Sequence, residues 1–450
     1  MSDLYLIDVP PPTISGSLHM GHVFSYCHMD FIARFQELKG KQLVYPFCFD
    51  CNGLPTEKLA NKNSIREQAA IIHFAEEKAI VYEEHFAMQR MGWSKERYHS
   101  FSANAVELAN LSFTDLVEKK LAYKANRTYF YCPVTKVSVS QSEIDDNGCY
   151  ERSGAKVEVR EGEGWFINIL DHLPRIREAI DQIKWHPDYF RERLHSWLNQ
   201  VQYDWSISRE RNYGIAIPGE KPGIVFDTWF TSSLSPQMTW TSHTGNVSLA
   251  CPVFDARFQA HDIIRTWALF TIIKSIYHND QIPWKNVIVS GHALDTKAAK
   301  LSKSAGNTTA PIQYFKQYDT YGVRFWAAQN QIGTDTRIDP QIMSKGKKLA
   351  NKIRNARRFI SLNAEAGGIN DEYMCEWHQV EKTIETELNN FQYANAISAL
   401  TTFFWGRFCD VFIEASKQAP CNDTLDAILT EIVDWYEIYL PGIKQELLDK

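Results

Sequence analysis

Two histidines stand three residues apart where a helix is expected to begin. The segment His19-Met20-Gly21-His22 follows an apolar strand and a turn. Free N–H groups and the dipole at a helix start attract phosphates, and glycine lets a ligand come close. Imidazole N–H groups can then stabilise oxygens that gain charge during phosphoryl or adenylyl transfer. Two surface histidines, or a metal site that lacks further ligands, are the alternative interpretations.

A second segment near residue 300 could also contact phosphates. Lys300-Leu301-Ser302-Lys303-Ser304 places two lysines among small residues. Two point charges on such a loop could fold over a triphosphate, with their effect largest in the transition state. A Lys/Ser loop by itself is more often a solvated turn. Its position downstream of the histidine motif, in the second half of one β/α pattern, favours a nucleotide site.

Two other patterns have competing interpretations. Cys48 and Cys51 form a Cys-x-x-Cys, compatible with a redox or zinc site, but no second pair accompanies them and packing is preferred. A run of seven cations comprises Lys345, Lys347, Lys348, Lys352, Arg354, Arg357 and Arg358. It could follow an RNA backbone or form a solvated helix face. The aromatic residues Phe403, Phe404, Trp405, Phe408 and Phe412 are interpreted as bundle core.

Alternating strands and helices must position these residues. Residues 4–9 form an apolar strand, residues 23–38 have helical spacing, and residues 42–49 form a strand with Asp50 at its end. This pattern predicts an α/β fold with a doubly wound parallel sheet of Rossmann type. Further expected elements are helices over 64–91, 103–120 and 171–200, short strands over 125–165, a β/α pattern over 205–340 and helices from 341.

The predicted organisation is a sheet domain split by a small insertion and followed by an α-helical bundle. The first half of the nucleotide-binding domain is expected over 1–120 and the second half over 205–340. A short connective insertion is expected over 121–204, and the helical domain over 341–450.

Composition excludes several classes of protein. No apolar run approaches the ~18 residues that span a bilayer, and the mean hydropathy is −0.35. The first residues lack the basic and apolar regions of a secretory signal, and nine scattered cysteines fit a reducing compartment. The net charge of −6 excludes a globally basic nucleic-acid coat, although not a local basic face. We therefore expect a cytoplasmic protein without membrane contact. The sequence does not determine the oligomeric state, and a monomer is one possibility.

Longer stretches resemble the class I aminoacyl-tRNA synthetases. The segments at 19–22 and 300–304 match the two signature sequences of that class. PPPTISGSLHMGH, FDCNGLPTEKL and AHDIIRTWALF are similar to stretches of valyl-tRNA synthetases, and the resemblance covers nearly the whole chain. It implies ATP-dependent activation of an aliphatic amino acid, most closely valine, with Mg²⁺. Transfer to a valine-type tRNA would follow.

The same resemblance implies roles for individual residues. ATP contacts are implied for His19, Gly21, His22, Gly291, His292, Lys300, Ser302, Lys303 and Ser304, the two histidines and two lysines being catalytic. Amino-acid contacts are implied for Pro11, Asp50, Trp229, Asp262 and Ile263, with Asp50 on the ammonium group and Asp262 near it or the ribose. Without the resemblance, Trp229 and Ile263 would be read as core residues. The seven cations would bind tRNA.

The predicted insertion departs from the family pattern. Cys132 and Cys149 each stand where a pair of cysteines would be needed, and two thiolates cannot close a tetrahedral zinc site, so we expect no structural zinc. The range 121–204 is too short for a hydrolytic editing domain, and no coiled-coil tail follows the helical segment. A valine pocket cannot strongly reject the nearly isosteric threonine. We therefore expect the enzyme to attach threonine to tRNA in error, or to rely on another protein for editing.

Three hypotheses remain. The first is a valyl-tRNA synthetase without editing, and the second is a specialised paralogue that supplies an activated amino acid or aminoacyl-tRNA to a biosynthetic pathway. The third is a non-catalytic tRNA-binding or regulatory relative, although a binding module would not need both signature sequences.

Overall fold

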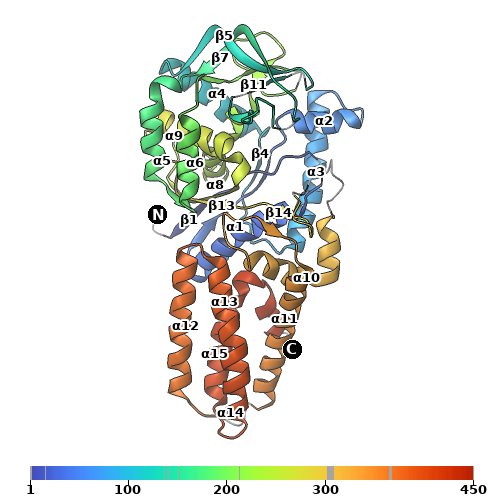
Figure 1. Ribbon diagram of the computed structural model, residues 1–450, viewed down its shortest axis with the longest axis vertical. Helices are drawn as coiled ribbons and strands as arrows, with labels where there is room; N and C mark the ends of the chain where they lie inside the picture. The colour runs from blue at the N-terminus through green and yellow to red at the C-terminus, as the bar shows by residue number, and fades with distance from the viewer. Residues whose placement is uncertain are drawn as a thin grey trace.

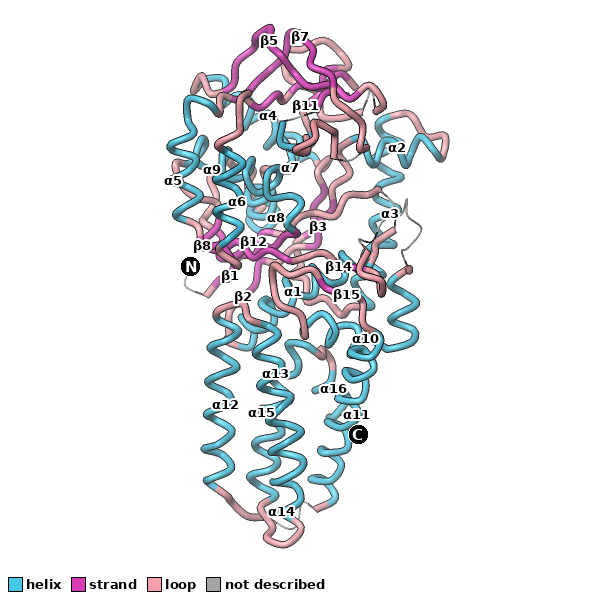
Figure 2. Tube along the Cα trace, in the orientation of Figure 1, coloured by secondary structure: helices cyan, strands magenta, loops and turns pink. Residues whose placement is uncertain are grey.

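An α/β part stands above a bundle of long helices (Figures 1 and 2). The computed structural model describes residues 3–15, 17–135, 137–139, 141–151, 153–211, 213–299, 301, 309–363 and 367–448. The predicted α/β fold with a parallel sheet and a following helical bundle is confirmed.

The central sheet has five parallel strands in the order β2-β1-β12-β13-β8. Their bounds are β1 Leu4–Asp8, β2 Gln42–Val44, β8 Lys184–His186, β12 Phe254–Ala260 and β13 Trp284–Ser290. Helix α1 (Met20–Leu38) connects β1 to β2, whereas α9 (Leu269–Asn279) connects β12 to β13 in the opposite direction. The boundary between β1 and β12 is therefore the topological switch point, where open α/β sheets bind ligands beyond their carboxyl ends.

One predicted strand is wrong in its extent. Residues 42–49 form two strands, β2 and β3 (Phe47–Phe49), and β3 pairs with β4 (Arg97–His99) outside the central sheet. Pro46 lies between them, and proline has no N–H to donate to a strand ladder. The switch of sheets follows from that lost hydrogen bond.

The remaining helices of the first half pack against other helices of the α/β part. They are α2 (Leu54–Lys62), α3 (Gln68–Met88) and α4 (Ala103–Glu118). Helices α3 and α4 match the predicted ranges 64–91 and 103–120, whereas α2 was not predicted.

A small antiparallel sheet with strand order β6-β5-β7-β9 forms a cap above the α/β part (Figure 1). Its strands are β5 (Ala122–Cys132), β6 (Val137–Val139), β7 (Glu158–Ile167) and β9 (Trp205–Ser206), with the 3₁₀ turn η1 (Gln141–Glu143). The range predicted as helical over 171–200 instead contains η2 (Leu170–His172), α5 (Leu173–Gln182), β8 and α6 (Tyr189–Leu198). Because β8 pairs with β13, this part of the range 121–204 contributes to the central sheet. The domain boundaries stay a prediction.

The second half completes the α/β part and leads into the bundle. Its elements are β10 (Ser208–Glu210), β11 (Ile224–Phe226), α7 (Thr228–Ser232), α8 (Ser235–Thr244), η3 (His261–Ile263), the π-helix η4 (Ile264–Ala268), β14 (Ala293–Leu294), α10 (Pro311–Ala328) and β15 (Thr336–Arg337). The bundle consists of α11 (Pro340–Leu362), α12 (Asp371–Asn389), α13 (Tyr393–Phe403), the π-helix η6 (Phe404–Ile413), α14 (Glu414–Ser416), α15 (Asn422–Tyr439) and α16 (Ile443–Leu448).

The bundle core is largely as predicted. Phe403, Phe404, Phe408 and Phe412 are buried, whereas Trp405 is exposed beneath Lys352, whose Nζ lies 5.5 Å from the ring centroid. By length and composition, the helical segment Tyr393–Ser416 could also cross a membrane. Half of its most apolar window is buried, and the core helix of any bundle passes the same test.

Two buried histidines make the fold sensitive to acid. Burial lowers the pKa of His28 on α1 and of His278 on α9 to about 4. Unfolded histidine titrates near 6.5, so the unfolded chain takes up these protons first as the pH falls. Stability is therefore complete above about pH 6.5 and declines towards pH 4, by about 1.4 kcal/mol per pH unit for each histidine.

Urea unfolding midpoints measured between pH 7.5 and 4.5 check this expectation. His28 Nε2 contacts the Ala327 carbonyl oxygen at 3.1 Å, a bond that a glutamine amide can replace without titrating. The His28→Gln variant should therefore show a flatter decline than the wild type. Equal slopes for the two proteins would contradict the assignment.

Candidate functional site

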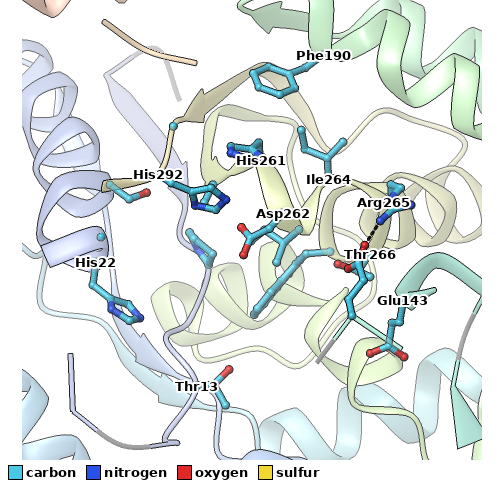
Figure 3. Close-up of a pocket in the computed structure, with 18 of the residues that line it drawn as sticks. Thr13, His22, Glu143, Phe190, His261, Asp262, Ile264, Arg265, Thr266 and His292 are labelled. Atoms are coloured by element: carbon cyan, nitrogen blue, oxygen red, sulfur yellow. Dashed lines mark hydrogen bonds and ion pairs between the residues drawn. The ribbon is translucent and has the colours of Figure 1, made fainter. Parts of the chain in front are cut away.

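A cleft of about 1480 Å³ opens at the switch point of the central sheet (Figure 3). Its lining comes from the turn between β1 and α1, the residues after β12, the residues after β13, and the segment 143–151 of the small sheet region. Nine sequence-predicted residues line it: Pro11, His19, Gly21, His22, Trp229, Asp262, Ile263, Gly291 and His292.

The two histidines of the first motif cap the helix that they begin. The Gly21 N–H donates to His19 Nδ1 (3.1 Å), and the His19 N–H donates to His22 Nδ1 (3.2 Å), which is a capping box built from imidazoles. A ring nitrogen that accepts a hydrogen bond carries no proton, so each neutral ring holds its proton at Nε2. Both rings therefore offer an N–H donor, and both line the cleft.

Gly21 has a role that the sequence does not reveal. A Cβ at this position would lie 2.9 Å from the ring of His19. The glycine therefore makes room for the capping imidazole, in addition to leaving space for a ligand.

The ends of β12 and β13 bring a second pair of imidazoles to the cleft. His261 and His292 have ring centroids 4.0 Å apart. The carboxylate of Asp335 accepts the backbone N–H of His292 (2.8 Å) and lies 3.5 Å from His261 Nε2. The exposed carboxylate of Asp262 points into the cleft beside them (Figure 3). This carboxylate is the one best placed to meet a cationic ligand group.

An apolar wall completes the cleft. Pro11, Ile263 and two tryptophans line it, with Trp229 and Trp267 edge to face at 5.6 Å between centroids. The side chain of Asp227 caps α7 by accepting the backbone N–H of Trp229 (3.4 Å). Such a wall suits an aliphatic side chain, because it offers burial without requiring a hydrogen bond.

Asp50 is not among the residues that line the cleft. Its carboxylate is buried and accepts hydrogen bonds from the Ser100 hydroxyl (2.6 Å), the Asn52 N–H (3.0 Å) and the Ser232 hydroxyl (3.4 Å). Its backbone joins the β1–α1 turn, through Ile14 N–H to Asp50 O at 2.9 Å. In this structure Asp50 therefore ties β3 to the turn below the cleft.

Gly291 packs backbone against backbone. A Cβ there would lie 2.0 Å from the Thr334 carbonyl oxygen and 2.6 Å from Asp335 N. Gly291→Ala must push this segment away, and we expect a loss of at least about 3 kcal/mol in the free energy of unfolding. Chemical denaturation measures it, with Gly406→Ala as the control, because nothing lies within 4 Å of a Cβ at Gly406. Equal stability of the two variants would be incompatible with the close approach.

Acidic residues line the side of the cleft that faces the small sheet. Glu143, Asp145, Asp146 and Glu151 belong to the lining, and Glu151 forms an ion pair with Arg265 of η4. Burial raises the pKa of the Glu151 carboxyl, and neighbouring carboxylates add to this effect while Arg265 opposes it. Sequence reasoning missed these residues and Trp267, although AHDIIRTW contains both Trp267 and Arg265.

The second signature lies outside the described residues. Lys300, Ser302, Lys303 and Ser304 are not described, whereas Leu301 is, and it lines the cleft. Their roles stay predictions.

The cysteine patterns behave as packing residues where the structure describes them. Cys48 and Cys51 are buried free thiols, and burial raises the pKa of Cys51 to about 12 and that of Cys48 further. Thiols with raised pKa values are poor nucleophiles and metal ligands. Cys132 lies in a small apolar cluster with Val139 and Tyr150. The absence of structural zinc stays a prediction.

The basic run on α11 divides into two sets. Arg354 binds Glu446 (2.6 Å), Arg357 pairs with Asp426, and Lys352 lies over Trp405. The other four are exposed and form no ion pair with another described residue: Lys345, Lys347, Lys348 and Arg358. This second set is exposed to an external anion, whereas Arg354 and Arg357 are engaged in ion pairs.

Known families match both parts of the chain. The model for tRNA synthetases class I (I, L, M and V) matches residues 2–219 and 220–339. The model for the anticodon-binding domain of tRNA ligase matches residues 372–450.

Individual relatives agree with these matches. Valine–tRNA ligase of Rickettsia conorii is 25% identical, with 99% of this chain and 84% of that protein covered. The same enzyme of Anaplasma marginale is 26% identical, with 93% and 77% covered. Methionyl-tRNA synthetase of Mycobacterium tuberculosis bound by methionyl-adenylate has a similar fold, with a TM-score of 0.81 at 18% identity over 99% of this chain and 93% of that one. A LeuRS of Agrobacterium radiobacter in a ternary complex with tRNA and LeuAMS has a TM-score of 0.82 at 15% identity. The match covers 99% of this chain and 85% of that one.

The switch-point cleft, the paired imidazoles that cap α1 and the helical bundle agree with these matches. The chain belongs to the class I tRNA synthetases (I, L, M and V) and is a ligase of the aminoacyl-tRNA synthetase type.

Proposed function

We propose that this enzyme activates an aliphatic amino acid, most closely valine, with ATP and transfers it to a valine-type tRNA without editing. The observation that carries the proposal is a single cleft in which two imidazole donors face an apolar wall of proline, isoleucine and tryptophan. A nucleotide and a small apolar amino acid could bind there side by side. The names of the relatives favour valine.

The first step is attack of the amino-acid carboxylate on the α-phosphorus of ATP, with pyrophosphate leaving. This reaction needs positioning and charge stabilisation rather than a protein nucleophile. His19 and His22 would donate from Nε2 to phosphate oxygens, because their Nδ1 atoms are occupied by backbone N–H groups. Asp262 would bind the substrate ammonium or the ribose. Lys300 and Lys303, with Ser302 and Ser304, would hold the β- and γ-phosphates.

Mg²⁺ would enter with the nucleotide. Magnesium prefers oxygen ligands, and in nucleotide sites it takes one or two carboxylates in addition to phosphate oxygens. The cleft lining includes several carboxylates besides Asp262, among them Glu143 and Asp145, which fit this requirement. When bound, the ion would neutralise phosphate charge.

The absence of editing rests on the size of the inserted region. The alignment with the Rickettsia conorii enzyme runs over 679 residues, more than the 450 of this chain, so that relative has residues within the aligned region that this chain lacks. Apart from α5, β8 and α6, whose buried residues belong to the main core, the inserted region holds the strands β5, β6 and β7 of the small sheet, with a small core of Cys132, Val139 and Tyr150. A core of this size supports a connector rather than a hydrolytic domain.

Transfer to tRNA would use the bundle. The exposed cations of α11 would contact the phosphate backbone, so Lys348→Glu should weaken tRNA binding by about tenfold and lower the salt dependence of the affinity. Lys382→Glu on α12 is the matched charge reversal, and should change the affinity by less than twofold. Filter binding at several salt concentrations measures both, and equal losses would exclude a specific role for α11.

A second candidate function is favoured by the acidic lining. Glu143, Asp145 and Asp146 line the cleft, and carboxylates repel the phosphates of tRNA. An acceptor other than tRNA, as in a specialised biosynthetic paralogue, would avoid this repulsion. Charging assays with tRNA transcripts separate the two functions, since only the first gives aminoacyl-tRNA.

The test of the proposed function is an amino-acid screen by ATP–pyrophosphate exchange with the full chain. Valine should give the highest kcat/KM, with threonine and isoleucine weaker. If none of the amino acids tested supports pyrophosphate exchange, the proposal is overturned and a non-catalytic relative is favoured. A cytoplasmic monomer is also proposed, which the nine free thiols support for the compartment.

A further inference from the structure

A buried guanidinium lies directly behind one wall of the cleft. Trp267 of the π-helix η4 lines the cleft, and the Cζ atom of Arg257 lies 5.2 Å from its ring centroid. Arg257 is fully buried and is not part of the lining, so it contacts the indole from within the protein core. Its other neighbour is Trp284, whose ring centroid is 5.4 Å from Cζ. The cation therefore lies between two indoles.

Arg257 is fixed by a carboxylate on the neighbouring strand. Asp8 of β1 and Arg257 of β12 are register partners at the switch point, and Arg257 Nη1 donates to Asp8 Oδ2 at 2.7 Å. The same oxygen accepts the Trp284 indole N–H (2.8 Å) and the Ser235 hydroxyl (3.1 Å). Both members of the ion pair are fully buried. The guanidinium is thus held in one place.

The indole of Trp267 is held by packing rather than by a hydrogen bond to any described residue. Trp267 Nε1 is buried and has no hydrogen-bond partner among the residues that the structure describes. Within the core, its ring packs edge to face against Trp229 and lies against the guanidinium of Arg257. Desolvated cation–π contacts are among the stronger ones. Trp267 also lies in a π-helical turn, a geometry frequent at functional sites.

We propose that Arg257, held by Asp8, is the positioning residue that fixes the Trp267 wall and so sets the size of amino-acid side chain that the cleft accepts. This inference rests on the proposed function, because it assigns the Trp229–Trp267 wall to the amino-acid side chain. Arg257 does not touch the substrate. Its loss should let the indole move and enlarge the pocket, which weakens binding of the small cognate side chain and admits larger ones.

The experiment compares Arg257→Met with Arg324→Met in ATP–pyrophosphate exchange with valine and isoleucine. Arg324 is the matched control, since it is also fully buried and pairs with an aspartate (Asp30, 2.7 Å), but it does not line or back the cleft. Arg257→Met should raise KM for valine about tenfold and narrow the valine/isoleucine ratio of kcat/KM about tenfold. The KM for ATP should stay within twofold. Arg324→Met should leave the KM for valine and the ratio within twofold.

Two further variants keep the test decisive. Asp8→Asn removes the charge that anchors Arg257, and it should shift the same ratio in the same direction by about threefold, so it decides the question if Arg257→Met does not fold. Arg257→Lys keeps a cation behind the indole and should restore part of the discrimination. The positioning role would be overturned if folded Arg257→Met kept the wild-type KM for valine and the wild-type valine/isoleucine ratio of kcat/KM. It would also be overturned if Arg324→Met changed both quantities as much as Arg257→Met does. Either result would leave the proposed function intact. No exchange by the wild type would overturn both.

Discussion

Replacing His22 with alanine is expected to lower kcat/KM for amino-acid activation by about 10²–10³-fold. The Nε2–H of His22 is one of two preorganised donors on the cleft, and loss of one such donor to a developing oxyanion costs about 3–4 kcal/mol of transition-state stabilisation. His19→Ala should have an effect of similar size. ATP–pyrophosphate exchange under subsaturating ATP measures the loss.

Part of the effect of alanine could come from the helix end, because both imidazoles are caps. Asparagine at position 19 and glutamine at position 22 preserve capping acceptors, which are worth about 1 kcal/mol each. His19→Asn and His22→Gln should therefore keep wild-type Tm values and still lose most of their activity. Activity within threefold of wild type in the alanine variants would refute the assignment of the site. Full activity in the capping-competent variants alone would assign the histidines to helix capping.

Threonine is expected to be attached to tRNA at a level about a hundredfold above that of an editing enzyme. Valine and threonine have nearly the same shape, and the wall of Pro11, Trp229 and Trp267 distinguishes them only through the cost of burying a hydroxyl. Discrimination of this kind is worth about 10². Apart from β8, which joins the central sheet, and the helices α5 and α6, the inserted region contributes the strands β5, β6 and β7 of the small sheet.

The measurement is charging of tRNA with labelled threonine, together with ATP consumption per aminoacyl-tRNA formed. An enzyme without hydrolytic proofreading should use close to one ATP per product with either amino acid. Isoleucine serves as the comparison, since its extra methylene must clash with the pocket and it should be rejected by size. High ATP consumption with threonine, or misacylation as low as in an editing relative, would contradict the expected absence of editing.

Features that depend on residues close together in the sequence were predictable from the sequence. The histidine motif follows a strand and begins a helix, and its capping contacts join residues no more than three apart. The parallel sheet followed from alternating apolar strands and helices, and the bundle from helical spacing after residue 341. The fold class was therefore correct, as were the buried phenylalanines of η6.

Errors arose where a local pattern allowed two outcomes. Residues 42–49 have uniform strand character, but Pro46 cannot donate to a ladder, so the chain changes sheets there. Residues 171–200 have a helical pattern throughout, yet Lys184–His186 forms the edge strand β8, which pairs with β13. In both places a partner distant in sequence decided the outcome.

The sequence by itself determined the fold class, the first motif and the residues at the strand ends, because each depends on period, turn chemistry or short spacing. Only the tertiary structure decided which side chains meet. It joined Asp8 to Arg257 across β1 and β12 and placed Arg257 behind Trp267. It also brought the acidic segment 143–151 to the cleft, and it buried Asp50 among hydroxyl groups. These contacts depend on strand order and on packing between segments up to hundreds of residues apart, which no local pattern encodes.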